Sequence, residues 1–325
     1  MAASTAHSSP ITPNFFLAGV VKGGTTSLGH YLNNHPEVYL SPIKETTFLS
    51  QRDMDFARFR KDYRMDVQLD VSRYVRGPMT ERIHIAHVEA WEDYLRLFAP
   101  AKGFRAIGEA SVSYAICPSA APAIHARLPQ ARIVLMLRDP VSRCFSQYLM
   151  NRKEGKTLET DFLREVRNDQ EQAHHGWGVS HQYLELGMYA DQVARFQQLF
   201  PKEQLCLLDY HDFRKDPADT LRQIFAFLGV DTAVAVDTSE RLNEAQMPRF
   251  ARLQYALTQA GVVGMVKRML PRNARKVVMK RLYSKQSLPA LTPEQRAFLI
   301  DHYREDVARL ETLWNKDLSH WLQPD

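Results

Sequence analysis

The sequence predicts an α/β protein built on a doubly wound, mainly parallel sheet with helices on both faces. Three stretches indicate this, because each pairs a short apolar run with a following helix signal: residues 14–34, 132–153 and 203–229. Strands that alternate with helices are typical of parallel sheets, whose ligands bind at the carboxyl ends of the strands. A chain of 325 residues is long enough to bury the core of one such domain.

The first stretch predicts a strand from Asn14 to Val20 that runs into a glycine-rich loop. A helix should follow, since Leu28, Tyr31 and Leu32 recur at helical spacing before His35-Pro36 ends the pattern. A glycine loop between a strand and a helix presents backbone N–H groups to an anion. We therefore expect a P-loop-like phosphate-binding loop here.

The spacing of this loop departs from the usual P-loop pattern G-x-x-x-x-G-K-[ST]. Gly19, Gly24 and Thr26 take the glycine and hydroxyl positions, but Thr25 stands where the lysine belongs. Lys22 lies three residues earlier. The loop thus predicts a phosphate site whose lysine approaches from a different place.

The second stretch predicts a strand over Ile133–Leu137, with Arg138 and Asp139 at its carboxyl end and Pro140 in the first turn of a helix. In the third, EQLCLLDYHDF reads as a strand, followed by a helix that begins with a proline and ends at Gly229. From about residue 249 the chain is expected to be mainly helical, and Thr292-Pro293-Glu294-Gln295 should begin its last helix.

Composition is that of a soluble globular enzyme, with 45% apolar and 24% charged residues. We expect a disordered tail over residues 1–12 and one domain over 13–325, with its α/β core at 14–230. No secretory signal or membrane span is visible. Three scattered cysteines, Cys117, Cys144 and Cys206, favour a reduced, cytoplasmic protein without a disulfide framework.

A basic segment at residues 267–285 holds eight Lys/Arg residues and no acidic residue, within a net charge of +5. Its interspersed apolar residues favour amphipathic helices broken at Pro271. The segment is either a solvated helix face or a peripheral contact to anionic lipid at the inner membrane surface or to a polyanion. Nucleic acid is not an expected partner.

Magnesium-dependent phosphoryl transfer needs an acidic residue at the end of a second apolar strand, and Asp139 and Asp209 are the candidates. Arg138 precedes Asp139, and a cation there suits a second phosphate better than a metal. A nucleotide with an extra phosphate and no required metal is therefore indicated. A sulfuryl group carries less charge than a terminal phosphate, so a lysine and backbone amides can stabilise its transfer.

Four stretches together resemble one family. They are GVVKGGTTSL, KETTFL, LRDPVSRCFSQY and the run from Leu184 to Val230. This combination resembles the sulfotransferases that use 3′-phosphoadenosine-5′-phosphosulfate (PAPS), in the carbohydrate, heparan-sulfate type branch and its bacterial relatives. The resemblance covers residues 14–230 and implies transfer of a sulfuryl group to the hydroxyl of a carbohydrate, a glycolipid or another small alcohol.

The resemblance also implies roles for single residues. Lys22, Gly23, Gly24, Thr25, Thr26 and Ser27 match the loop that binds the 5′-phosphosulfate, where Lys22 would stabilise the departing phosphate. Arg138 and Ser146 match the pair that binds the 3′-phosphate, and Arg249 matches a contact in the segment that closes over the nucleotide. No metal site is implied.

Glu45 matches the catalytic base, which would take the proton of the acceptor hydroxyl. The sequence departs from the heparan-type pattern just after it, because Thr47 and Ser50 stand where those enzymes often carry a histidine and an acid. Glu109 in GEASVSY is either a second base or a structural hydrogen-bond acceptor, and we favour the structural role.

Two stretches are candidates for the acceptor wall, that is, for the residues that line the binding site of the acceptor substrate. One is residues 52–96, with Arg73, Tyr74 and Arg76; the other holds Trp177 and Tyr183. His174, His175 and His181 fit no metal-site spacing. Two alternatives stay open at this point, an ATP-dependent small-molecule kinase with a degenerate P-loop and a non-enzymatic nucleotide-binding module held at membranes.

Overall fold

The computed structural model confirms the predicted fold class. It describes residues 10–56, 59, 67, 69–171, 182–239, 247–261, 283–284 and 288–323. The central sheet has the order β2-β5-β1-β6-β7, and each neighbouring pair is parallel. These strands are β1 (Phe15–Gly19), β2 (Val38–Leu40), β5 (Ala106–Ala110), β6 (Arg132–Leu137) and β7 (Leu205–Asp209).

The two faces of the sheet bury separate cores, because successive side chains of a strand point to opposite sides. Phe15 and Leu17 of β1 pack into one core with the helices α1 (Thr25–Asn33), α10 (Tyr210–Lys215) and α11 (Pro217–Leu228). Phe16 and Ala18 pack into the other. The helices on that face are α5 (Ser113–Ile116), α6 (Ala120–Arg127), α7 (Pro140–Lys153), α8 (Phe162–Gln170), α9 (Tyr189–Gln197) and α15 (Pro293–Trp314).

Two smaller sheets flank the central one. The strands β3 (Ile43–Glu45) and β4 (Ile83–Ile85) form a parallel pair, and β8 (Met247–Pro248) and β9 (Tyr283–Ser284) an antiparallel pair. Short helices complete the chain: η1 (Phe48–Asp53), α3 (Val71–Arg76), α4 (Trp91–Arg96), η3 (Ala99–Ala101), η4 (Glu185–Gly187), η5 (Lys202–Gln204), α12 (Ala251–Gln259) and η6 (Ser319–Leu322).

The predicted helix boundaries at Pro140, Gly229 and Thr292 are confirmed, and each has a local cause. The Asp139 carboxylate caps α7 by accepting from the amides of Val141 and Ser142. Gly229 ends α11 in a left-handed conformation. Thr292 and Gln295 form a capping box at the start of α15.

The third predicted strand was too long. It ends at Asp209, and Tyr210–Lys215 forms the helix α10 instead. The Asp209 carboxylate accepts from the amide of His211 at 2.8 Å, which starts the helix at the strand end. The short strands β8 and β9 were likewise not predicted within the C-terminal part, where α12 and α15 are helical as expected.

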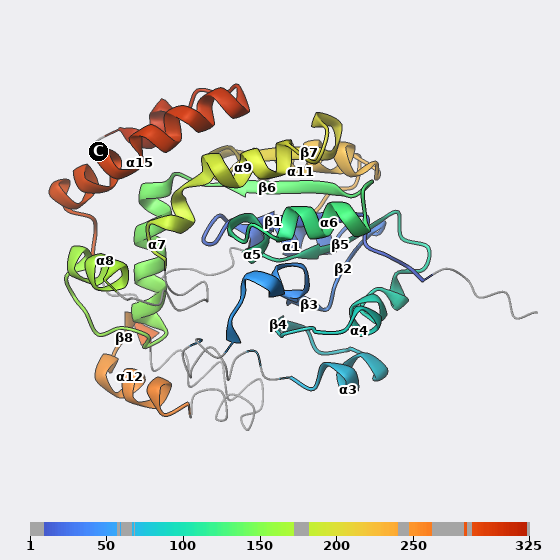
Figure 1. Cartoon of the computed structure of the whole chain (residues 1–325), viewed down its shortest axis with the longest axis horizontal. Helices are drawn as coiled ribbons and strands as arrows, with labels where there is room; N and C mark the ends of the chain where they lie inside the picture. The colour runs from blue at the N-terminus through green and yellow to red at the C-terminus, as the bar shows by residue number, and fades with distance from the viewer. Residues whose placement is uncertain are drawn as a thin grey trace, which may run out of the picture.

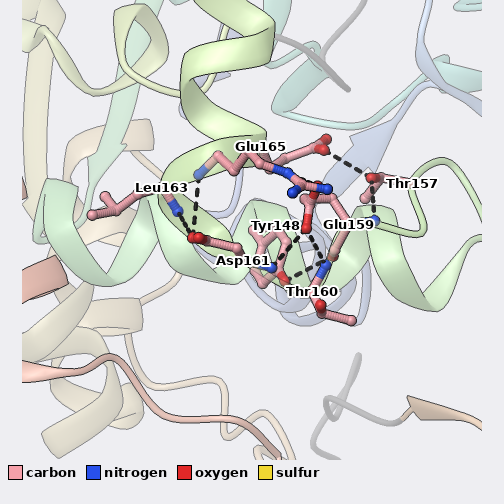
Figure 2. Close-up of polar contacts among 8 residues, drawn as sticks. Tyr148, Thr157, Glu159, Thr160, Asp161, Leu163 and Glu165 are labelled. Atoms are coloured by element: carbon pink, nitrogen blue, oxygen red, sulfur yellow. Dashed lines mark hydrogen bonds and ion pairs between the residues drawn. The ribbon is translucent and has the colours of Figure 1, made fainter.

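Helix α7 stands at one end of the sheet, with α8, α12 and α15 gathered around it (Figure 1). The turn between α7 and α8 is organised by polar contacts (Figure 2). The Tyr148 hydroxyl donates to the Glu159 carbonyl, and the Asp161 carboxylate caps α8. Thr157 donates to Glu165 at 2.8 Å. These contacts fix the carboxyl-terminal half of α7, which reaches the phosphate loop.

Several predicted features fall largely outside the described residues. They are most of the tail 1–12, the basic segment 267–285 apart from β9, and the three histidines at 174, 175 and 181 with Trp177. Of the helices that the described ranges contain, none is long and apolar enough to cross a membrane.

Candidate active site

The phosphate loop lies at the carboxyl end of β1, in the middle of the sheet. The amide of Val20 donates to the Met136 carbonyl at 3.0 Å, which ties the loop to β6. This space has no room for a side chain: a Cβ on Gly23 would lie 2.7 Å from that carbonyl, and one on Gly24 would lie 2.6 Å from the Tyr210 ring. Both glycines are therefore required for the close approach of the loop to β6 and α10.

Helix α1 begins directly after the loop, at Thr25. Gly24 is its N-cap residue, with φ of 90°, and no side chain caps the first turn. The first amides of a helix have no partner within the helix, and the helix dipole adds positive potential there. The predicted loop residues Thr25, Thr26 and Ser27 thus form the uncapped first turn of α1, which favours an anion.

Lys22 projects from the loop toward the carboxyl-terminal half of α7. Its Nζ lies 3.7 Å from the Met150 sulfur, which is a weak acceptor. The pKa of Lys22 is lowered to about 8, mainly by burial; Glu154 opposes this shift, and Arg138 adds to it. Lys22 also has a left-handed φ of 63°, which costs a non-glycine residue roughly 1 kcal/mol. A strained, partly desolvated lysine is typical of a functional position.

Arg138 follows β6 and lies next to the loop. Its Nη1 donates to the Lys22 carbonyl at 3.1 Å, and its Cζ lies 4.8 Å from the Tyr210 ring centroid. Burial lowers its pKa, and no carboxylate among the described residues forms a salt bridge with it. The neighbouring Asp139 carboxylate is engaged as the cap of α7. Arg138 therefore keeps guanidinium donors for an anionic ligand.

The other two predicted nucleotide contacts are less tightly placed. Ser146 is half-buried on α7, two turns after the start of the helix, and Arg249 is exposed between β8 and α12. Their contacts to a 3′-phosphorylated nucleotide stay predictions. Tyr210, which packs against both Gly24 and Arg138, was missed by the sequence interpretation. Its signal was its position directly after a strand end.

Glu45 lies at the end of β3 and is buried, with 5% of its surface exposed. One carboxylate oxygen accepts from the Lys44 ammonium at 2.7 Å, and the other from the Val112 amide at 2.8 Å. Two residues later, Thr47 has a left-handed φ of 55° and contacts His87 at 3.0 Å. The contacts with Lys44 and Val112 hold the Glu45 carboxylate in one orientation, as a catalytic base requires.

Glu109, in β5, is fully buried and completely enclosed by hydroxyl groups. Thr46, Ser111 and Tyr114 donate to one oxygen at 2.5–2.7 Å, and Tyr94 donates to the other at 2.5 Å. Burial raises its pKa against these four hydrogen bonds. With both oxygens engaged, Glu109 holds β5, α4, α5 and the chain just after β3 together, as expected of a structural acceptor.

The predicted acceptor wall at Tyr183 is wrong. Its side chain is fully buried: the hydroxyl accepts from Asn151 at 2.6 Å and donates to Glu165 at 3.0 Å. The aromatic ring belongs to the core beside α7 and not to a surface. In the other stretch, Arg73 and Arg76 are exposed on α3. Tyr74, between them on the same helix, is half-buried, and its hydroxyl donates to the Glu81 carbonyl.

Comparison with known proteins agrees with this geometry. The profile described as "Sulfotransferase family" matches residues 13–233. Human "Carbohydrate sulfotransferase 15" is 26% identical over 257 residues, covering 67% of this chain and 44% of that protein. Human "Bifunctional heparan sulfate N-deacetylase/N-sulfotransferase 3" is 23% identical over 318 residues, covering 96% of this chain and 31% of that protein. The chain thus spans less than half the length of these curated relatives.

Among solved structures, a sulfotransferase from Alicyclobacillus acidocaldarius is similar over nearly the whole chain. Its TM-score is 0.72 at 29% sequence identity, and the alignment covers 96% of this chain and 100% of that one. The similarity therefore includes the C-terminal part beyond residue 233.

Proposed function

The chain belongs to the sulfotransferase family, and we propose that it transfers a sulfuryl group from PAPS to an acceptor hydroxyl by in-line displacement. The observation that carries the proposal is the pair of cations beside the uncapped first turn of α1. The Lys22 ammonium contacts the Met150 sulfur, and the Arg138 guanidinium donates to the Lys22 carbonyl. Both side chains therefore have N–H donors left for phosphate. Two separate cations suit a nucleotide with a 5′-phosphosulfate and a 3′-phosphate.

In this reaction the acceptor oxygen forms a bond to sulfur while the bond from sulfur to the bridging oxygen breaks. Glu45 takes the proton of the acceptor hydroxyl. The electron pair stays with the departing 5′-phosphate, whose growing charge Lys22 and the first-turn amides of α1 stabilise. The 3′-phosphate supplies binding energy at Arg138, which holds the reacting end in register.

The proposed acceptor is a carbohydrate or another small alcohol. The names of the relatives support a carbohydrate, since they refer to carbohydrate and to heparan sulfate. The heparan-type pattern is not kept just after Glu45, at Thr47 and Ser50. We therefore propose the class of acceptor and not a particular saccharide.

The kinase alternative is not favoured. It needs Asp139 or Asp209 to hold magnesium, but the two carboxylates cap α7 and α10. Asp209 also lies 3.7 Å from the Lys316 ammonium and 3.4 Å from His320. The carboxylates of both aspartates are therefore engaged in capping the helices that begin near the loop.

Calorimetric titration in EDTA tests the proposal directly. The ligands are 3′-phosphoadenosine-5′-phosphate (PAP) and ADP, which differ in where the second phosphate sits. We expect PAP to bind without magnesium and at least tenfold more tightly than ADP. Equal affinity for ADP, or binding that appears only with magnesium, would contradict the sulfotransferase assignment of the site.

We also propose that the basic segment 267–285 contacts an anionic surface, in a protein that works in the cytoplasm. The support is its eight cations without an acid, together with the exposed Phe250 just before α12 and the exposed Leu253 on it. Flotation with vesicles of phosphatidylserine and phosphatidylcholine, compared with phosphatidylcholine alone, tests the lipid. Equal partitioning to both vesicle types would contradict it.

A further inference from the structure

The C-terminal helix α15 packs against α9 and caps the start of that helix (Figure 1). Met188, the N-cap residue of α9, makes no side-chain cap. Instead the Asp306 carboxylate of α15 accepts from the amide of Tyr189 at 2.6 Å and from that of Ala190 at 3.2 Å. Asp306 is buried, with 3% of its surface exposed. The orphan amides at the start of α9 are therefore satisfied by a distant part of the chain.

Tyr189, the first residue of α9, reaches from this capped turn to the nucleotide site. Its side chain is fully buried, and its ring packs edge-on against Trp321 of η6, with the ring centroids 6.1 Å apart. Its hydroxyl donates to the Arg138 carbonyl at 2.9 Å. Burial raises the pKa of the Tyr189 phenol, so the hydroxyl keeps the proton that it donates.

The Arg138 carbonyl is where β6 gives way to α7. Arg138 follows the last residue of β6 and precedes Asp139, which caps α7. Because a peptide group is planar, a hydrogen bond to this carbonyl fixes the backbone from which the Arg138 side chain projects. The guanidinium is held at its other end, by the Lys22 carbonyl at 3.1 Å and the Tyr210 ring at 4.8 Å. An arginine oriented in this way loses little freedom when an anion binds.

We propose that Tyr189 and Asp306 are positioning residues for the nucleotide, which hold Arg138 where the 3′-phosphate of PAPS binds. The inference rests on the proposed function, because it takes Arg138 as the contact of that phosphate. Asp306 holds Tyr189, and Tyr189 holds the backbone of Arg138. The C-terminal helix thus contributes to nucleotide selectivity, although the matched family profile ends at residue 233.

Tyr189→Phe tests the first contact, because it removes the hydroxyl and keeps the buried ring. The full chain is titrated with PAP and with ADP in EDTA. We expect PAP to bind about fivefold more weakly and ADP to bind as in wild type, since only PAP carries a 3′-phosphate. Tyr39→Phe is the matched control, because the Tyr39 hydroxyl donates to the Leu97 carbonyl from β2, at the far edge of the sheet. It should change neither affinity.

A double variant shows whether Tyr189 acts through Arg138. If it does, adding Tyr189→Phe to Arg138→Met should cause no further loss of PAP affinity. A role of Tyr189 that is independent of Arg138 would give losses that add. The ratio of PAP to ADP affinity is the decisive readout, because a general loss of stability does not select between the two nucleotides.

Two substitutions of Asp306 test the second contact. Asp306→Ala removes the cap of α9, and we expect PAP affinity to fall about threefold at unchanged ADP affinity. Asp306→Asn keeps an oxygen that accepts from the same amides and should retain most of the PAP affinity. Asp216→Ala, which removes the cap of α11, is the matched control. It should lower stability to urea without changing the ratio of PAP to ADP affinity.

Three results separate the possible failures. Unchanged PAP affinity in Tyr189→Phe or in Asp306→Ala, or an equal loss for PAP and ADP, would overturn the positioning role. A further loss in the double variant would also overturn it, with the proposed reaction intact. Equal affinity of the wild-type chain for PAP and ADP would instead overturn the proposed function.

Discussion

The two sides of the phosphate loop differ in how far their charged groups are satisfied. On the β6 side, the Lys22 ammonium contacts one sulfur and the Arg138 guanidinium one carbonyl and one aromatic face. On the β5 side, Glu45 accepts two hydrogen bonds and Glu109 four. A buried charge without partners is costly, so the β6 side gains most from an anionic ligand.

The two carboxylates on the β5 side also differ from each other. Glu109 is enclosed by hydroxyl groups of Thr46, Ser111, Tyr94 and Tyr114, whereas Glu45 accepts only from Lys44 and from the Val112 amide. The four hydrogen bonds to Glu109 hold the surrounding elements in place. The two hydrogen bonds to Glu45 leave its carboxylate a lone pair that can take a proton. The difference teaches that burial alone does not mark a catalytic carboxylate.

The largest effect should come from Glu45→Gln. Removing a general base lowers turnover by roughly 10²- to 10⁴-fold, and we expect kcat to fall within that range while PAP affinity is unchanged. The measurement is transfer of labelled sulfuryl group from PAPS to an accepted saccharide, with PAP calorimetry alongside. The exposed Glu203→Gln on η5 is the matched control. A kcat within threefold of wild type would remove Glu45 from the reaction.

Arg138→Met should give the next largest effect, on the β6 side. Losing a charged hydrogen bond costs about 1.5–3 kcal/mol, so we expect PAP to bind at least tenfold more weakly, with little change for ADP. Arg132→Met is a matched control, because Arg132 starts the same strand and also donates Nη1 to a carbonyl, that of Leu228. Equal losses for PAP and ADP would show that Arg138 does not read the 3′-phosphate.

Glu109→Gln should act on stability and not on the reaction. The amide replaces one accepting oxygen with a donor that faces hydroxyl donors, and an unsatisfied buried group costs about 1–3 kcal/mol. Urea denaturation should show the free energy of unfolding lowered by that amount, and by more than in Glu165→Gln, which is only half-buried. A kcat loss comparable to that of Glu45→Gln at unchanged stability would make Glu109 the base instead.

Local signals in the sequence were sufficient for the parts of the site that form within a few residues. The glycine loop, the helix start at Pro140, the cap at Thr292 and the helix end at Gly229 all follow from neighbouring residues. The P-loop-like spacing also placed Lys22 correctly in the loop. These features need no knowledge of distant packing, because the backbone partner of each lies within one helical turn.

Long-range packing could not be predicted in the same way. Asp306 caps α9 only because α15 packs against that helix, 117 residues after Tyr189 along the chain. Tyr183 looked like an exposed aromatic residue, yet two partners on other segments bury its hydroxyl. Helix α10 was missed because the apolar pattern of β7 continues past Asp209, whose side chain starts the helix.

The smallest predicted effect, and one that sharpens the contrast between the two sides, is the pH dependence of PAP binding through Lys22. Its pKa is about 8 in the folded protein against 10.5 for an ordinary lysine, mainly because of burial. The charged form is thus disfavoured by folding, and this destabilisation is present below pH 8 and disappears as the pH rises toward 10.5.

An anionic ligand favours the protonated lysine, so PAP binding should take up a proton above pH 8. Affinity should then fall by up to tenfold per pH unit. Calorimetry in buffers of different ionisation enthalpy counts that proton, and Lys22→Arg, which stays charged, should remove the dependence. A flat wild-type profile between pH 7 and 9 would place Lys22 outside the anion site.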